Sequence, residues 1–232
     1  MKNIRKDCKK SARERLRFRE DEARYPWLPM LLEACSIIDA GVLRAAEDFE
    51  KRHNRKLACK KGCGHCCRTH ADIPLYPLEL AGIYWFCTEK MPGGAREALK
   101  DRLRDYIRQG DDIGRNGAGE KEGDPGCVFL DGGACSIHPV RPLSCRQFNV
   151  FGRPCGPGED PYFTRRQDVL TPIREYADRA FFVMLPFYGI HDEARREKAV
   201  RDGLLHSQAV NLRSRDWRRL LKVMEESGAK GD

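Results

Sequence analysis

The sequence predicts a mainly α-helical fold with a small β-hairpin, an α+β arrangement in which amphipathic helices wrap a cysteine-rich core. Apolar residues recur at three- and four-residue spacings on both sides of that core, which is the period of amphipathic helices. Only residues 127–137 have the pattern of paired strands. Strands and helices do not alternate as they would in a parallel α/β fold. We therefore expect residues 1–232 to form a single domain.

Composition limits the class of protein. The chain has 43 Lys and Arg against 35 Asp and Glu, a formal net charge of +8, and 34% of its residues are charged. The longest apolar run extends from Phe181 to Ile190 and contains Pro186, whereas a bilayer span needs about 20 residues. No apolar stretch follows the basic N-terminus, so a signal peptide is not expected. These features predict a cytoplasmic protein that does not enter a membrane.

Residues 1–57 are predicted to form an N-terminal helical arm. Residues 3–24 are rich in Arg, Lys and Glu and lack Gly and Pro, which favours a helix. From Leu28 onward, apolar residues recur with helical spacing, and this predicts an amphipathic helix that ends near His53. Cys35 lies on the apolar face of that helix, so we interpret it as a buried small hydrophobic residue.

Two further helices are predicted in the middle of the chain. Pro77 suits the first turn of a helix whose apolar face includes Cys87, which we expect to be buried as well. A second helix is predicted from about Gly94 to Gln109. Residues 110–126 are polar and rich in glycine, so we expect a loop.

The predicted hairpin has its turn at Asp131-Gly132-Gly133. With this three-residue loop, Phe129 pairs with Cys135, and Cys127 becomes a diagonal neighbour of Cys135 on the same face, roughly 7 Å away at Cα. A two-residue loop would put the two cysteines on opposite faces of the hairpin.

Residues 168–226 are predicted to be C-terminal helices, from about Asp168 to Tyr188 and from Gly203 to Glu226. Before them, residues 143–148 suit one helical turn that carries Cys145. Cys155 lies in a turn rich in proline and glycine.

Cysteine is the most informative residue in the chain, which contains 11 of them. Reducing compartments keep thiols free, so a cytoplasmic cysteine cluster favours metal binding over disulfides. Thiolates are soft ligands that select zinc and iron–sulfur clusters. Residues 59–155 are therefore the predicted metal-binding core, and its candidate ligands are Cys59, Cys63, Cys66, Cys67, Cys127, Cys135, Cys145 and Cys155.

The run CKKGCGHCC opens this core, and Gly62 and Gly64 allow its backbone to wrap closely around a centre. Adjacent Cys66 and Cys67 point apart by about 100° on a helix, so they do not suit joint ligation of one ion. Two metal centres, a polynuclear cluster, or one ligand with one redox thiol all fit this pattern. The spacing does not decide between an iron–sulfur cluster and two zinc sites of four thiolates each.

Charged groups flank the predicted ligands. Arg141 and Arg146 lie on either side of Cys145 and could offset thiolate charge beside the metal, or each could pair with an acid elsewhere. His65, His70 and His138 lie near the cysteines without any periodic pairing, so we expect them beside the centre or on the surface rather than on the metal.

The segments CKKGCGHCC and CVFLDGGACSIHPVRPLSCRQF, followed by Cys155, together resemble the CxxCxxCC cysteine-cluster family. Members of this family are described as zinc- or iron-chelating domains, and they include flagellin lysine N-methylases. The resemblance covers about residues 59–155 and implies that the eight cysteines named above form the cluster. It also places Arg141, Pro142 and Arg146 at family positions. Cys8, Cys35 and Cys87 lie outside the motif.

Two functions follow as hypotheses, with no catalytic residue identified. The first is an iron–sulfur protein with a role in redox chemistry or protein modification, which would use S-adenosylmethionine if it methylates lysine. The second is a zinc-stabilised module that binds a protein or nucleic acid. We expect a protein partner ahead of nucleic acid because the basic residues are mixed with acidic ones.

Overall fold

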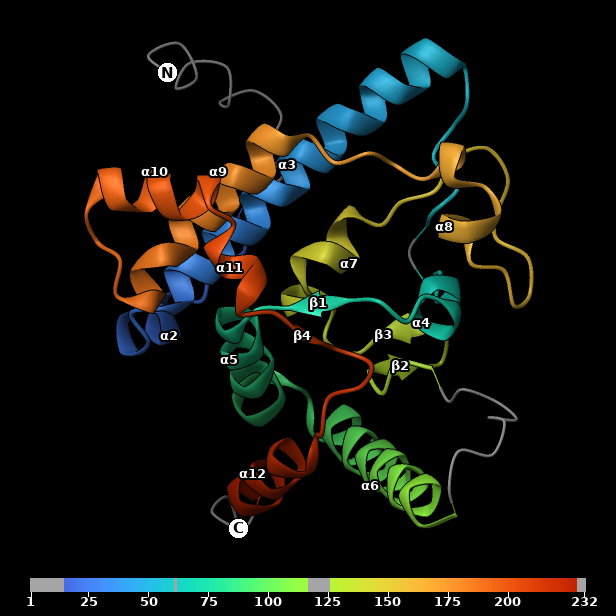
Figure 1. Cartoon of the computed structure of the whole chain (residues 1–232). Coiled ribbons are helices and arrows are strands. Elements are labelled where there is room, and N and C mark those ends of the chain that lie inside the picture. The colour runs from blue at the N-terminus through green and yellow to red at the C-terminus, as the bar shows by residue number, and fades with distance from the viewer. Residues whose placement is uncertain (1–14, 61, 117–125, 229–232) are drawn as a thin grey trace.

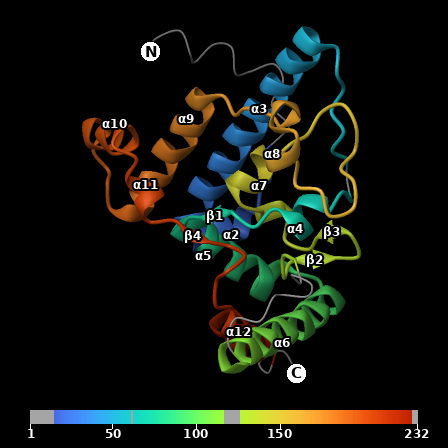
Figure 2. The same ribbon diagram turned by 45° about the vertical axis from the view of Figure 1, so that its right-hand side comes forward.

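The computed structural model describes residues 15–60, 62–116 and 126–228. Helix α3 (Leu28–His53) runs through one half of the molecule and packs against α9 (Arg174–Met184) and α7 (Leu143–Gln147) (Figure 1). Helices α6 (Gly93–Asn116) and α12 (Arg218–Gly228) pack together at the opposite end (Figure 2). The cysteine-bearing segments lie between these two helical groups. The predicted mainly α-helical class with small β elements is confirmed.

Helix α3 has the predicted bounds. Pro29 sits in its first turn, where no N–H partner is needed, and Asn54 ends it in the left-handed conformation with φ 49°. Leu28, Ile38 and Cys35 are at most 5% exposed. The predicted apolar stripe is therefore core, and Cys35 is the buried small residue that we expected.

The N-terminal prediction is tested only in part. Residues 1–14, including Cys8, lie outside the described residues, and helix α2 covers Arg19–Arg24. Residues 15–18 are not helical, so the predicted helix over residues 3–24 is wrong for that stretch.

The middle helices begin close to where they were predicted. Helix α5 (Pro77–Trp85) starts at Pro77 and continues into one π-helical turn, Phe86–Lys90, which holds Cys87 fully buried. Helix α6 runs to Asn116, beyond the predicted end at Gln109, so the first part of the predicted loop is helical. A glycine costs a helix only about 1 kcal/mol, which an established helix can absorb. The rest of that loop, residues 117–125, lies outside the described residues.

The predicted C-terminal helices are shorter than expected. Helix α9 starts at Arg174 because Pro172 favours extended backbone before it, and Val169 forms a β-bridge with Val150. The predicted helix over residues 203–226 is wrong: it is divided into α11 (Leu204–Ser207), β4 (Val210–Asn211) and α12. Strand β4 pairs antiparallel with β1 (Pro74–Leu75), and this tertiary pairing overrides the helical pattern. Helix α10 (Glu193–Arg201) was not predicted.

The apolar residues of that C-terminal segment are nevertheless buried. Leu205, Leu212, Leu220 and Met224 are all core residues. Trp217 packs edge-on against Phe129 with ring centroids 5.0 Å apart, and neither side chain is exposed. This contact fixes the C-terminal segment against the chain that follows Cys127.

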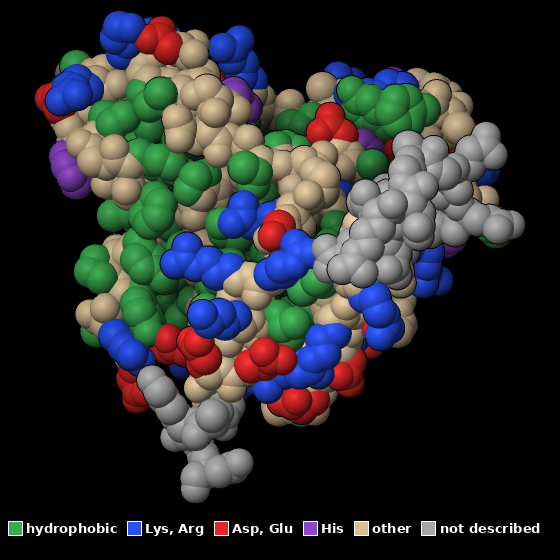
Figure 3. Space-filling view, turned by 60° about the horizontal axis from the view of Figure 1, so that its bottom comes forward, with side chains coloured by type: hydrophobic (Ala, Val, Ile, Leu, Met, Phe, Trp, Pro, Cys, Tyr) green, Lys and Arg blue, Asp and Glu red, His purple; other side chains and the backbone are tan. Residues whose placement is uncertain are grey.

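Charges of both signs are mixed on the face formed by α6 and α12 (Figure 3). Arg104 pairs with Glu225 at 2.7 Å, and Arg218 pairs with Asp216 at 3.1 Å. Such pairing leaves little uncompensated positive charge on this face to attract an anionic surface. No helix within the described residues is long and apolar enough to cross a bilayer.

Glu79 joins the start of α5 to the start of α7. Its side chain is 1% exposed, and its two carboxylate oxygens accept hydrogen bonds from the N–H groups of Tyr76 at 2.8 Å and Leu143 at 2.6 Å. Burial raises the pKa of Glu79 to about 7, while the two N–H donors and Arg146 act in the opposite direction. The carboxylate therefore connects two elements that are distant in the sequence.

We predict that Glu79→Ala lowers the free energy of unfolding by about 2–4 kcal/mol, because it leaves two buried N–H groups without an acceptor. Urea denaturation measures the change. Glu47→Ala, which removes an exposed carboxylate on α3, serves as the control and should change stability by less than about 0.5 kcal/mol. Equal denaturation midpoints for the two variants would contradict this role of Glu79.

Candidate metal centre

The run CKKGCGHCC wraps closely against the hairpin, as its glycines predicted. Gly62 has φ +83°, in the left-handed region that favours glycine. A Cβ atom at Gly64 would lie 2.7 Å from the carbonyl oxygen of Gly133 and 2.7 Å from a methyl group of Leu130. Helix α4 (His65–Thr69) follows at once and carries Cys66 and Cys67. The absence of a side chain at Gly64 thus permits the first cysteine segment to contact the second.

The predicted hairpin register is wrong. Strands β2 (Leu130–Asp131) and β3 (Ala134–Cys135) pair Leu130 with Cys135, so the turn contains only Gly132 and Gly133, both with positive φ. Such a two-residue turn suits the twist of the strands. The prediction of a three-residue loop assumed that Cys127 belongs to the first strand of the hairpin. In the structure the strand begins only at Leu130. The Leu130 N–H bonds to the Cys127 carbonyl oxygen at 2.9 Å in a tight turn.

One group of thiols comprises Cys59, Cys63, Cys66 and Cys155. Burial raises the pKa of Cys59 to about 11, and the thiols of the other three act in the same direction. Burial also raises the pKa of Cys155, with Cys63 and Cys66 among the further causes. Since charge interactions weaken with distance, these effects show that the turn bearing Cys155 lies close to the CKKGCGHCC run.

A second group comprises Cys127, Cys135, Cys145 and, again, Cys66. Burial raises the pKa of Cys145 well above its ordinary value, and the thiols of Cys127, Cys135 and Cys66 raise it further. Burial likewise raises the pKa of Cys127 to about 11, with contributions from Cys135 and Cys66. The hairpin, α7 and α4 therefore bring their cysteines together despite the different register.

Cys66 is common to both groups. A hydrogen bond with the Cys67 thiol and burial both raise the pKa of Cys66. Helix geometry separates adjacent side chains by about 100°, and we expected these two to point apart, yet their thiols are hydrogen-bonded. Cys66 and Cys67 thus act as neighbours at the junction of the two groups.

Backbone amides are directed at three of the sulfur atoms. The Val150 N–H donates to Cys59 Sγ at 3.3 Å. Hydrogen bonds from the N–H groups of Phe129 and Ile137 act to lower the pKa values of Cys127 and Cys135, against the larger effect of burial. Amide donors of this kind stabilise thiolates and orient them beside a metal.

The two predicted arginines have different positions. Arg141 lies near the cysteines, where its charge acts to lower the pKa values of Cys66 and Cys135. Arg146 is buried and bonds to Asp39 at 2.8 Å and to the carbonyl oxygens of Pro139 and Arg141. Arg146 thus anchors α7 to α3 through an ion pair. Its positive charge also acts to lower the pKa of Cys135.

The three histidines near the cysteines lie in different environments. His70 Nδ1 lies 3.0 Å from a carboxylate oxygen of Asp160, and the His70 ring packs on Phe148. His138 is exposed, and His65 is half-buried on α4. The carboxylate beside His70 fixes the orientation of that imidazole.

Two arginines near the cysteines were missed by the sequence analysis. The Nη2 atom of Arg165 lies 3.7 Å from Cys155 Sγ, and this buried guanidinium also contacts Glu159 and Asp168. Arg213 donates to the carbonyl oxygens of Cys67 and His70, and its charge acts to lower the pKa of Cys127. No spacing in the sequence relates either arginine to its cysteine, because tertiary packing alone brings them together.

The chemistry of the donors suits a metal bound by thiolates. All ten cysteines in the described residues are free, and eight of them form the two groups or adjoin Cys66. Within residues 15–60, 62–116 and 126–228, however, no three His, Cys, Asp or Glu side chains are already arranged around the position of one ion. Within the described residues, the thiols therefore lie on adjoining segments but do not have the geometry of a complete coordination sphere for one ion.

Residues 58–169 match the model of the CxxCxxCC family, which is described as a "putative zinc- or iron-chelating domain". Because of this similarity we refer to residues 58–169 as the CxxCxxCC domain. The resemblance noted from the cysteine pattern is thereby confirmed, and the match extends past Cys155 to the β-bridge at Val169. The chain matches no curated protein and no solved structure.

The buried thiol of Cys87 provides a contrast for the CxxCxxCC domain. Burial raises the pKa of Cys87 to about 12, and the thiol lies near Cys135 without an amide donor among the causes of its shift. We predict that Cys63→Ala and Cys135→Ala each destabilise the protein by about 3 kcal/mol or more, since structural metal sites contribute roughly 10 kcal/mol. Cys87→Ala should cost only about 1 kcal/mol, through a small cavity.

Melting temperature and metal content, measured on the same preparations, test this prediction. Cys87→Ala should retain the metal of the wild-type protein, and the other two variants should lose it. Equal melting temperatures for all three variants would contradict a structural cysteine cluster.

The contact at Gly64 gives another prediction. Gly64→Ala should separate CKKGCGHCC from the hairpin and lower both metal content and melting temperature, because its Cβ meets a backbone carbonyl that cannot easily move. Gly94→Ala is the matched control, since its Cβ would enter open space at the start of α6. Wild-type metal content in Gly64→Ala would show that the close approach is not required.

Proposed function

We propose that the CxxCxxCC domain binds an iron–sulfur centre through Cys59, Cys63, Cys66, Cys67, Cys127, Cys135, Cys145 and Cys155, and that the protein acts in redox chemistry or in modification of another protein. The observation that carries the proposal is the number of free thiols on adjoining segments, with Cys66 and Cys67 adjacent on α4. Adjacent side chains on a helix diverge by about 100°, which does not suit joint ligation of one zinc ion. Iron–sulfur clusters are polynuclear and suit a continuous set of thiols.

The residues around the thiols support a charged cluster. Arg141 and Arg165 supply positive charge beside Cys66 and Cys155, and both act to lower the pKa of the thiol they approach. The amide of Val150 donates to Cys59 Sγ. Hydrogen bonds to sulfur and local charge are the features by which a protein sets the potential of a bound cluster, and such a cluster supplies one-electron transfer.

Exposure is uneven across the thiols. Cys127 lies beside the fully buried Phe129, whereas Cys63, Cys66 and Cys155 are half-buried. Cys135 and Cys145 are half-buried as well, so Cys127 is the most shielded thiol of the set. A centre with one shielded side and one accessible side suits exchange of electrons with a partner protein.

The alternative is a zinc-stabilised binding module for a protein or nucleic-acid partner. The amide donors to Cys59, Cys127 and Cys135 favour thiolates on zinc as they do on iron. For nucleic acid, binding would have to weaken steeply with salt. The paired charges on α6 and α12 argue against that mode on this face.

Lysine methylation is suggested by the flagellin lysine N-methylases of the family. The strands of the described residues form two antiparallel pairs, β1–β4 and β2–β3. The usual doubly wound site for S-adenosylmethionine needs parallel strands with helices between them. A methylase would therefore have to bind S-adenosylmethionine at a site of another kind. The test is whether a methylated lysine product forms when S-adenosylmethionine and a protein substrate are supplied.

Anaerobic purification followed by metal and sulfide analysis tests the proposal. We expect iron and inorganic sulfide to co-purify, with visible absorption and an EPR signal in one oxidation state. Cys66→Ala should lose more iron than Cys35→Ala, since Cys35 lies on the buried stripe of α3. A colourless protein that holds only zinc would remove the iron–sulfur proposal and leave the zinc module.

A further inference from the structure

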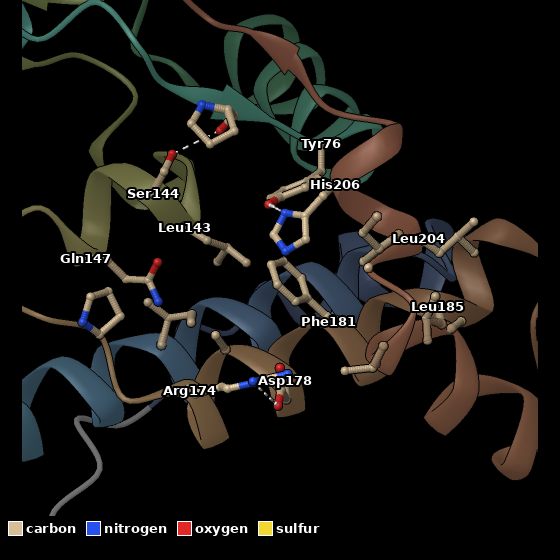
Figure 4. Close-up of a pocket in the computed structure, with 18 of the residues that line it drawn as sticks. Tyr76, Leu143, Ser144, Gln147, Arg174, Asp178, Phe181, Leu185, Leu204 and His206 are labelled. Atoms are coloured by element: carbon tan, nitrogen blue, oxygen red, sulfur yellow. Dashed lines mark hydrogen bonds and ion pairs between the residues drawn. The ribbon is translucent and has the colours of Figure 1, made fainter.

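A cavity of about 450 Å³ lies on the far side of α7 from the cysteine groups. Helices α9, α10 and α11 form one side of it, and α7 with the start of α5 forms the other (Figure 4). Leu143 and Ser144 line the cavity, while the next residue, Cys145, belongs to the thiol group. None of the cysteines in the described residues lines this cavity, so it is distinct from the proposed metal centre.

The walls of the cavity are mostly apolar. Small-molecule sites typically occupy about 300–1,000 Å³ and combine apolar walls with a few polar groups. The volume of this cavity falls in that range. Its principal apolar lining residues are Ile38, Leu143, Phe181, Leu185, Leu204 and Leu205.

A polar pair from distant parts of the chain lies at one end. The Tyr76 hydroxyl is 3.0 Å from His206 Nδ1, and the Phe181 ring packs edge-on against both rings (Figure 4). Tyr76 is 3% exposed, and burial raises its pKa, so the hydroxyl keeps its proton and donates to Nδ1. With Nδ1 accepting from Tyr76, the His206 ring carries a hydrogen on Nε2, where it can donate to a ligand.

The charges along the cavity do not balance. Arg174 and Asp178 both line it and pair with each other at 3.5 Å. Arg201 also lines it and has no carboxylate partner within the described residues. The adjacent Asp202 is paired with Lys198. One guanidinium is therefore available at the cavity for an anionic group.

We propose that this cavity binds a small amphipathic carboxylate. The apolar body lies against the leucines and Phe181, and the carboxylate is attracted by the charge of Arg201; His206 and Gln147 are polar side chains that line the same cavity. Gln147 extends from α7 toward the interior of the cavity (Figure 4). This binding site is independent of the metal that the cysteines hold, apart from the wall that α7 provides to both.

Titration calorimetry on the full-length, metal-loaded protein tests the proposal, with decanoate as the probe. Decylamine in its protonated form has an apolar chain of the same length with the opposite charge. We expect one decanoate to bind per chain and decylammonium to bind far more weakly. Arg201→Gln should weaken decanoate binding by about three- to fivefold, the effect of a solvent-accessible ion pair. Arg195→Gln, on the same helix but outside the cavity, should leave it unchanged.

Filling the cavity gives a second test. Ala199 lines it from α10, so Ala199→Trp should abolish decanoate binding while the metal content stays that of the wild type. Absence of decanoate binding to the wild-type protein would overturn the proposal. So would equal binding of decanoate and decylammonium, or wild-type affinity in Arg201→Gln or Ala199→Trp.

Discussion

The free energy needed to ionise thiols that lie close together in a buried site is the constraint on which the rest of this structure depends. Burial and mutual charge raise the pKa values of Cys59, Cys127 and Cys145, so these thiols resist ionisation when no cation is near. A metal cation reverses that balance because it favours the thiolate form directly. Until a cation binds, the fold must hold the thiols together by other means. Those means are the contacts that position the segments on which the cysteines lie.

These contacts come from residues outside the cysteine motif. Arg146 ties α7 to Asp39 on α3, and Glu79 ties the start of α7 to the start of α5. Trp217 packs on Phe129 and so holds the turn that follows Cys127. Each contact joins a cysteine segment to a helix or segment distant in the sequence. The helical framework thereby keeps the thiol-bearing segments close together before a cation binds.

The sequence predicted correctly the features that depend on neighbouring residues, and it failed where residues distant in the sequence interact. Helix α3 was predicted with its correct ends because its apolar stripe and proline act locally. The resemblance of residues 59–155 to the CxxCxxCC family came from the number and spacing of the cysteines, and the family match covers these residues. The prediction of the hairpin register failed because a tight turn at Cys127 replaces the assumed strand. The prediction of one long last helix failed because β4 pairs with β1. Arg165 and Arg213 could not be linked to their cysteines because nothing in the local sequence encodes tertiary proximity.

Helix α7 shows why the centre depends on the protein around it. It has only five residues, and a helix this short is not stable alone in water. Its position is set by Glu79 at the Leu143 amide, by the Ser144 hydroxyl donating to the Pro74 carbonyl, and by Arg146. These bonds fix α7 through the residues on both sides of Cys145 in the sequence. The position of the Cys145 thiol is therefore set by the contacts of α7 with α3 and α5. A substitution at those contacts would displace Cys145 although it changes none of the cysteines.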